Sequence, residues 1–191
     1  MSVLSDTEIL QEIKAGSIVI EPFRRSCLGS NSYDVHLGEW LGIYESDYLD
    51  CKLDDKIKYI QMNELSGFQL QPGQLYLGVT EEFTDTGVQL LPNIDGKSSI
   101  GRKGIFVHVT AGRGDAAFQG HWTLEIVCVK PVVIYPGMPI AQLTYETIRG
   151  KVARPYNKKK DAKYANHDPR PMQSMMWKNW HSERKSWVQE D

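Results

Sequence analysis

The chain has 191 residues, of which 41% are hydrophobic and 24% charged, and its formal net charge is -2 at pH 7. This balance fits one soluble globular domain with a tail, and it excludes a basic coat for nucleic acid. The sequence contains no apolar run near the roughly 20 residues that span a bilayer and no signal-peptide pattern at its acidic N-terminus. We therefore expect a cytoplasmic protein that binds neither membrane nor nucleic acid.

The N-terminal stretch predicts a helix followed by a short strand. Ser5-Asp6-Thr7-Glu8 has the form of a capping box, in which the serine and glutamate side chains satisfy free backbone N–H groups. Gly16 suits the left-handed residue that ends such a helix. The apolar residues 17–20 then predict a strand that stops before Pro22.

From there to about residue 150 the chain predicts a β-rich domain. Short apolar segments are separated by Gly, Pro, Asn and Asp turns at a spacing of roughly 8–12 residues, which is typical of a β-sandwich or β-barrel. We expect strands at residues 33–37, 68–70, 75–79, 105–110, 123–129 and 140–145, and a short helix at residues 98–103. Residues 41–66 are rich in Asp and Lys and predict either an insertion or a long surface hairpin.

The C-terminal part differs in composition from this β-rich domain. Residues 157–163 form a basic run, and Trp177, Trp180 and Trp187 follow among charged residues. Such a stretch is typical of a mobile or partner-bound tail rather than of a core. We therefore divide the chain into a β domain of residues 1–153 and a C-terminal segment of residues 154–191.

The sequence lacks the usual spacings of protein metal ligands. It contains no C-x-x-C, H-x-E or H-E-x-x-H motif, and its five histidines show no ligand spacing. Zinc sites need several Cys, His or carboxylate ligands close together, so we expect no zinc and no metal held by the protein. The three cysteines are far apart and favour free thiols over a disulfide.

The densest group of chemically active residues is D-G-K-S-S-I-G-R-K-G, residues 95–104. Hydroxyl side chains, glycines, Lys97 and Arg102 come together at a strand-to-helix turn. Backbone N–H groups and cations at such a turn can bind phosphate. The alternative is a polar turn capped by a serine, and composition alone leaves both open.

Two further stretches carry candidate carboxylates. Asp115 follows Gly112 and Gly114 at the end of an apolar strand, where it could accept a sugar hydroxyl, poise a water or simply close an Asx-turn. His108 lies in an alternating strand and is expected to be a core or interface histidine. Glu125 lies inside an apolar strand, where burial would suit it for acid–base work. Alternation could equally turn Glu125 to solvent, and the pattern does not decide between the two.

Six segments in register resemble the dCTP deaminase/dUTPase family. They are N-S-Y-D-V-H-L-G, G-K-S-S-I-G-R-K-G, H-V-T-A-G-R-G-D-A-A-F-Q-G, W-T-L-E-I, P-G-M-P-I-A-Q-L and R-P-Y-N-K-K-K-D-A-K-Y, and they cover roughly residues 4–167. The resemblance implies a mainly β protein with the distorted β-barrel or jelly roll of the trimeric dUTPase-like fold. It also implies a homotrimer whose active sites lie between subunits.

The resemblance assigns catalytic roles to Glu125, Ser98 and Arg102. Glu125 matches the general acid/base that deprotonates the attacking water and passes protons to the base and to the departing ammonia. Ser98 matches the hydroxyl that holds this water at C4, together with strand carbonyls near Val109. Arg102 matches the cation beside that Ser–Glu pair. Since a zinc deaminase needs a His/Cys/Cys or Cys₃ site, deamination here would proceed without zinc.

Other positions match nucleotide contacts of the family. Lys97 and Ser99 fall where the family binds the triphosphate, with Lys97 standing where Arg is common. Asp115 matches the carboxylate that contacts the 3′-hydroxyl, and Phe118 matches the aromatic ring under the deoxyribose. Gln142 matches a glutamine of a family motif that lies near the nucleotide base or near the hairpin beside it.

The segment of residues 154–164, called the lid below, matches the part of the family that closes over the substrate. Tyr156 and Lys163 match residues that fold over the triphosphate and its Mg²⁺. Two positions depart from the family: Gly114 replaces Ile or Val before the Asp, and His167 stands where the deaminases place Gln. The Trp-rich residues 172–191 have no counterpart in the family pattern.

These roles predict zinc-independent deamination of dCTP to dUTP and ammonia as the activity. The alternative is a bifunctional enzyme that also hydrolyses dUTP to dUMP and pyrophosphate, because Ala111-Gly112, Asp115 and Gln142 resemble members that do both. A second alternative is a nucleotide-binding regulator without catalysis. The expected ligands are dCTP and dUTP with Mg²⁺ bound through the triphosphate, and dTTP is a candidate inhibitor.

Overall fold

The structure is a computed structural model that describes residues 2–108, 110–165 and 167–182. In chain order the elements are α1 (Asp6–Ala15), β1 (Ile18–Glu21), η1 (Arg25–Cys27), β2 (Tyr33–His36), β3 (Trp40–Tyr44), β4 (Ile57–Gln61), β5 (Phe68–Leu70), β6 (Tyr76–Thr86), β7 (Leu90–Gly96), α2 (Ser98–Gly101), β8 (Ile105–Val107), β9 (Gln119–Cys128), β10 (Val132–Ile134), β11 (Pro139–Thr147), η2 (Tyr156–Lys158) and α3 (Met176–Ser182). The predicted mainly β fold is therefore confirmed.

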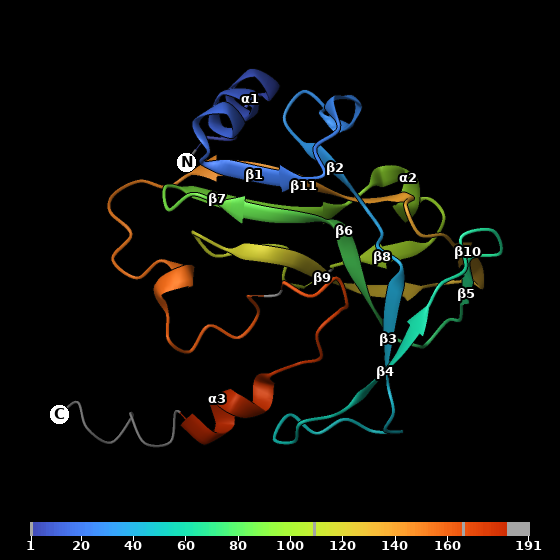
Figure 1. Ribbon diagram of the computed structural model, residues 1–191. Coiled ribbons are helices and arrows are strands. Elements are labelled where there is room, and N and C mark those ends of the chain that lie inside the picture. The colour runs from blue at the N-terminus through green and yellow to red at the C-terminus, as the bar shows by residue number, and fades with distance from the viewer. Residues whose placement is uncertain (1, 109, 166, 183–191) are drawn as a thin grey trace.

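The N-terminal helix α1 forms as its capping box predicts. The Ser5 side chain accepts a hydrogen bond from the Glu8 backbone N–H, and the Glu8 side chain accepts one from the Ser5 backbone. Gly16 ends the helix with a φ of 77°, in the left-handed region that favours glycine. Ile9 is the buried residue of this helix, which packs beside β1 at one end of the molecule (Figure 1).

All paired strands are antiparallel, in three sheets. The largest sheet has the order β4-β3-β6-β9-β8, with β1 also pairing with β6. A second sheet has the order β2-β11-β7, and β10 pairs with β5 in a small third sheet. Among the described strands no sheet closes on itself into a complete barrel, because each of these orders has open ends.

Strict alternation along β9 shows how the strands build the core. Trp122, Leu124 and Ile126 are buried, whereas Thr123 and Glu125 point to the outward face. The same period-2 pattern buries Tyr33 and Val35 of β2. The core therefore lies between the sheets, and the polar face of β9 is left available for a site.

Three local predictions are refined by the structure. β3 and β4 form the hairpin predicted for residues 41–66, with Trp40 opposite Gln61. The helix expected at residues 98–103 is confirmed but shorter, as α2. The strand expected at residues 105–110 ends as β8 at Val107, because His108 turns away with a φ of 54°.

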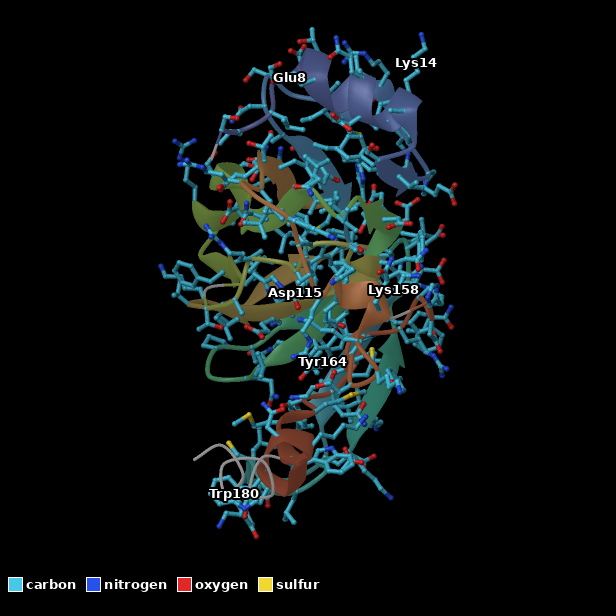
Figure 2. The ribbon with its side chains drawn as sticks, turned by 90° about the vertical axis from the view of Figure 1, so that its left-hand side faces the viewer. Glu8, Lys14, Asp115, Lys158, Tyr164 and Trp180 are labelled. Atoms are coloured by element: carbon cyan, nitrogen blue, oxygen red, sulfur yellow. The ribbon has the colours of Figure 1, made fainter. Side chains whose placement is uncertain are left out.

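The C-terminal segment runs along the outside of the β domain. In Figure 2 it passes from Lys158, near the level of Asp115, past Tyr164 to Trp180 at the end farthest from α1. Helix α3 lies beyond the β3–β4 end of the large sheet (Figure 1). No helix in the described part of the chain is long and apolar enough to span a bilayer.

Candidate active site

Glu125 is held on the outward face of β9 by backbone pairing on both sides. Leu77 of β6 lies opposite it, and the His108 backbone N–H donates to the Glu125 carbonyl oxygen at 3.0 Å. The Glu125 side chain is 42% exposed. Strand alternation, rather than burial in the core, therefore decides its position.

One oxygen of the Glu125 carboxylate accepts a hydrogen bond from a residue of the same chain. The Thr110 hydroxyl donates to Glu125 Oε2 at 3.1 Å, and His108 Nδ1 lies 4.0 Å from the same oxygen. His108 is partly buried, and its buried Nδ1 has no hydrogen-bond partner among the described residues. Burial lowers the pKa of His108, although the negative charges of Glu125 and Asp95 act in the opposite direction. Val109 lies outside the described residues.

In the turn at residues 95–102 the serine side chains are exposed to solvent, whereas the lysine side chain is paired with a carboxylate. Ser98 and Ser99 begin α2 and are exposed, as is Arg102 after it. The Lys97 ammonium contacts Asp34 Oδ2 at 2.6 Å. This lysine is thus held at the start of α2 by a carboxylate from β2.

Gln142 joins the same carboxylate from the other side. Its Nε2 donates to Asp34 Oδ1 at 2.9 Å and to the Ser32 hydroxyl at 3.3 Å. Gln142 of β11 lies opposite both Asp34 of β2 and Asp95 of β7, so sheet register brings these groups into one row. Sequence reasoning missed Asp34, although a carboxylate between two buried residues of the N-S-Y-D-V-H-L-G segment is the signal that could have found it.

A third group joins the Asp115 turn to the lid. Ala117 has a φ of 63°, and the Phe118 backbone N–H donates to the Asp115 carbonyl oxygen at 3.1 Å. Phe118 is buried, with its ring centroid 4.5 Å from that of Trp122 and 5.9 Å from that of Tyr156. Burial raises the pKa of Tyr156. The Asp115 turn therefore forms a platform on which the first aromatic residue of the lid rests.

The lid also supplies a cation to this turn. Lys159 Nζ contacts Asp115 Oδ2 at 3.1 Å, and the Tyr156 backbone N–H donates to the Ala116 carbonyl oxygen at 2.9 Å. Lys163 contacts Asn179 instead. Lys159, which the sequence did not single out within the basic run, is thus the lid residue beside Asp115.

The glycines of this region serve close packing. A Cβ atom at Gly112 would lie 2.4 Å from the Ile94 carbonyl oxygen, and one at Gly114 would lie 2.5 Å from the Trp122 ring. Gly114 also donates its backbone N–H to the Pro92 carbonyl oxygen at 2.8 Å. The glycine that departs from the family pattern is therefore the residue that lets Trp122 pack against this loop.

One chain brings some of the predicted site residues together and leaves others apart. Lys97 and Gln142 share Asp34, and Asp115, Phe118 and Tyr156 adjoin one another, as described above. Within the described residues, Glu125 has Thr110 and His108 as polar neighbours and makes no hydrogen bond or ion pair with Ser98 or Arg102. Ala111 is exposed. The roles assigned to the site residues stay predictions.

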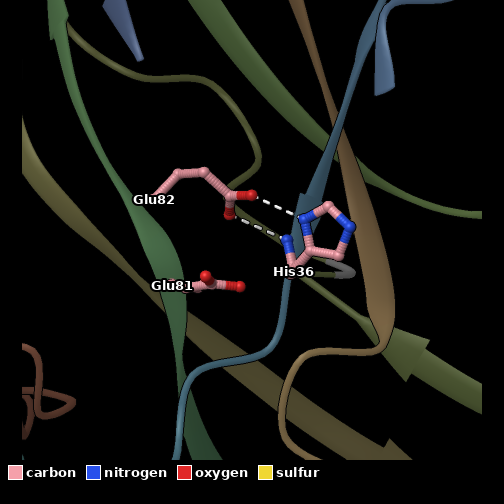
Figure 3. Close-up of side chains that lie close together, drawn as sticks. All are labelled: His36, Glu81 and Glu82. Carbon is pink, nitrogen blue, oxygen red and sulfur yellow. Dashed lines mark hydrogen bonds and ion pairs between the residues drawn. The ribbon is translucent and has the colours of Figure 1, made fainter. Parts of the chain in front are cut away.

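A further charge network is centred on the fully buried Glu82. His36, Glu81 and Glu82 have potential ligand atoms within 4.8 Å of one another (Figure 3). Glu82 accepts a bond from the His36 backbone N–H at 2.8 Å and lies 2.6 Å from His36 Nδ1. Arg24 contacts Glu81 at 2.5 Å and Glu82 at 3.3 Å. Because the Arg24 guanidinium contacts both carboxylates and Glu82 also contacts His36, these groups are paired within the chain, and we interpret them as a structural ion network rather than a metal site.

Comparisons with known proteins place the chain in a family. Residues 3–148 match the family model described as dCTP deaminase-like. A protein from Clostridium beijerinckii named "dCTP deaminase, dUMP-forming" is 45% identical over 165 residues, which cover 86% of this chain and 91% of that protein. A protein of the same name from Cytophaga hutchinsonii is 42% identical over 178 residues, covering 93% and 98%.

A solved structure agrees with the fold. The 2′-deoxycytidine 5′-triphosphate deaminase from Agrobacterium tumefaciens superposes with a TM-score of 0.61 at 18% identity, covering 76% of this chain. The superposed part is 47% of that protein, so this chain spans about half of its length. The likeness supports the fold alone. The family model spans most of the chain and the relatives match nearly all of it, so this chain belongs to the dCTP deaminase-like family.

Proposed function

We propose that the chain is an enzyme that removes ammonia from dCTP and hydrolyses the resulting dUTP to dUMP and pyrophosphate. One observation carries this proposal: relatives that are 45% and 42% identical over 86% and 93% of the chain are named as dUMP-forming dCTP deaminases. The prediction that the reaction ends at dUTP is therefore wrong, because those names favour the bifunctional alternative.

In the deamination step, water adds to C4 of cytosine and the bond from C4 to the exocyclic nitrogen breaks, releasing ammonia. Glu125 would take a proton from the water and pass protons to N3 and to the departing amino group. Its outward position supports this role, because Thr110 holds one carboxylate oxygen while the side chain stays 42% exposed. Ser98 would hold the water, and Arg102 would stabilise the developing charge.

We propose that the active form is a homotrimer whose sites lie between subunits. Within the described residues of one chain, Glu125 makes no hydrogen bond or ion pair with Ser98 or Arg102, which is consistent with a neighbouring subunit supplying these groups. Light scattering should give a trimer mass. A monomer that turns over dCTP at full rate would contradict the shared site.

In the hydrolytic step, water attacks the α-phosphorus and the bond to the bridging oxygen of the β-phosphate breaks, releasing pyrophosphate. Asp115 would contact the 3′-hydroxyl and orient this water, with the deoxyribose over Phe118. The contact between Lys159 and Asp115 supports a phosphate-facing turn, because the lysine could exchange the carboxylate for a phosphate oxygen. Lys97 and Ser99 would bind the phosphates from the α2 turn.

Mg²⁺ would enter the site as part of the nucleotide. Triphosphate oxygens are ligands that Mg²⁺ prefers, and it usually keeps several of its waters. The lid carries four lysines, Lys158, Lys159, Lys160 and Lys163, against one carboxylate, Asp161, which suits a triphosphate whose charge is only partly neutralised by the ion. Tyr156 and Lys163 would then cover the phosphates, and dTTP would inhibit by competing for the same pocket. We place this activity in the cytoplasm.

The experiment is to incubate the protein with dCTP and Mg²⁺, separate dUTP from dUMP by ion exchange, and assay ammonia and pyrophosphate. Equal amounts of ammonia, pyrophosphate and dUMP are expected. Accumulation of dUTP without pyrophosphate would contradict the hydrolytic step. Nucleotide binding without ammonia release would instead identify the non-catalytic regulator.

A further inference from the structure

The C-terminal segment beyond the lid is fastened to the β domain by side-chain hydroxyls. Residues 170–175, called the strap below, form neither helix nor strand. The Met172 backbone N–H donates to the Thr123 hydroxyl at 3.0 Å, and the Ser174 backbone N–H donates to the Tyr44 hydroxyl at 2.9 Å. The Tyr59 hydroxyl donates to the Pro171 carbonyl oxygen at 3.1 Å. The strap thus has specific receptors on β9, β3 and β4.

Packing around Pro171 fits this attachment. Pro171 is buried, and a Cβ atom at Gly42 would lie 3.4 Å from its ring. The guanidinium of Arg170 lies 5.1 Å from the centre of the Tyr59 ring. An apolar anchor and oriented hydrogen bonds together make a built contact rather than a tail resting on the surface.

The strap lies beside the proposed catalytic carboxylate. Thr123, which receives Met172, is two positions before Glu125 and points to the same outward face of β9. Burial raises the pKa of Tyr44, the hydrogen bond from Ser174 opposes this change, and the charges of Asp55 and Glu125 add to it. The strap is thus received on the face of β9 that carries Glu125.

The strap also holds the far end of the lid. The Met175 backbone N–H donates to the Tyr164 hydroxyl at 3.0 Å, and the Tyr164 backbone N–H donates to the Tyr156 hydroxyl at 2.8 Å. Lys163 contacts Asn179 in α3. Since Tyr156 is itself bonded to Ala116, the lid is tied to the β domain at its start and, through the strap, beyond its end.

We propose that the strap is an anchor that makes the lid a closed loop instead of a free tail, with Tyr44 and Tyr59 as positioning residues for nucleotide binding. A segment held at both ends samples fewer conformations, so it loses less entropy when it orders over a triphosphate. The strap therefore strengthens substrate binding without touching the reacting atoms. This inference rests on the proposed function, because it takes dCTP as the ligand that the lid covers.

The test removes the hydroxyls and keeps the ring shapes. Tyr44→Phe, Tyr59→Phe and the double variant each delete strap hydrogen bonds, and Tyr48→Phe is the matched control because Tyr48 is 74% exposed on the β3–β4 connection. We expect the KM for dCTP to rise about threefold in the single variants and about tenfold in the double variant. The kcat should stay within about twofold of the starting value, since Glu125 is unchanged.

Hydrogen exchange supplies a readout that does not depend on activity. The amides of Met172, Ser174 and Met175 should exchange slowly in the full chain and faster in the double variant. A chain shortened after residue 169 should reproduce the KM of the double variant, and one shortened after residue 182 should not. Faster exchange with an unchanged KM, or unprotected strap amides in the full chain, would overturn the inference.

Failure of the proposed function would look different. A full chain that releases no ammonia from dCTP would remove that function while its strap amides remained protected. The strap would then be judged by the Kd for dCTP from calorimetry, on the same variants. An equal Kd for the full chain and the double variant would count against the anchor.

Discussion

Glu81 and Glu82 are adjacent residues of β6 that both contact Arg24. We nevertheless expect their contributions to the free energy of unfolding to differ sharply. Glu82 is fully buried, whereas the side chain of Glu81 is 34% exposed and that of Arg24 is 39% exposed. In Glu82→Gln the new carbonyl oxygen can still accept the His36 backbone N–H. The new NH₂ group, however, faces the Arg24 guanidinium and the His36 ring.

The size of the effect follows from the contacts that are lost. The Arg24 guanidinium donates to Glu82 Oε1 at 3.3 Å, and His36 Nδ1 lies 2.6 Å from the same oxygen. Hydrogen bonds to a charged group contribute about 1.5–3 kcal/mol each, and breaking a buried pair costs about 3–5 kcal/mol. Because Arg24 is partly solvated, we expect Glu82→Gln to lower the free energy of unfolding by about 3 kcal/mol. Glu81→Gln should cost less than about 1 kcal/mol, since its pair is screened by water.

Urea unfolding followed by tryptophan fluorescence measures both variants. All samples need the same protein concentration, because unfolding of an oligomer depends on it. The free energy of unfolding should fall with urea concentration at the same slope in both variants and in the unmodified chain. The midpoints of unfolding then report differences in stability alone. Equal losses in the two variants, or a loss below about 1 kcal/mol for Glu82→Gln, would refute the assignment of this network as a buried structural one.

The remaining predictions concern the proposed site. Glu125→Gln should abolish ammonia release while dCTP binding, followed by calorimetry, persists; turnover like that of the unmodified chain would exclude Glu125 as the proton carrier. Burial lowers the pKa of His108 below its ordinary value. As the pH falls, the unfolded chain therefore takes up this proton before the folded chain does, and stability should fall as pH drops below about 6.5. His108→Gln should flatten this acid-side loss in urea titrations, and an unchanged pH profile would contradict it. A zinc-specific chelator should leave activity intact while removal of Mg²⁺ lowers it, and an essential stoichiometric zinc would overturn the metal assignment.

Much of the local structure could be predicted from neighbouring residues alone. The capping box and Gly16 act within one or two turns of helix, and the alternation of β9 depends only on side-chain direction along a strand. The motif segments likewise pointed to the family that the comparisons show. These features depend on interactions between residues that are near one another in the sequence, so they can be predicted from the sequence itself.

Tertiary structure decided which side chains meet. The pattern around Glu125 left burial and exposure equally open, and sheet register then turned it outward beside Thr110. Lys97 and Gln142 share Asp34 only because β11 lies between β2 and β7.

The longest-range contacts were beyond any local pattern. Glu82 meets His36 across 46 positions, and Ser174 of the strap reaches Tyr44 across 130 positions. Such contacts depend on strand order and on the path of the tail, which arise from packing of the whole chain rather than from spacing along it. The sequence therefore determined the N-terminal helix, most of the expected strands, the family and the candidate residues, whereas the arrangement of polar partners around them required the folded chain.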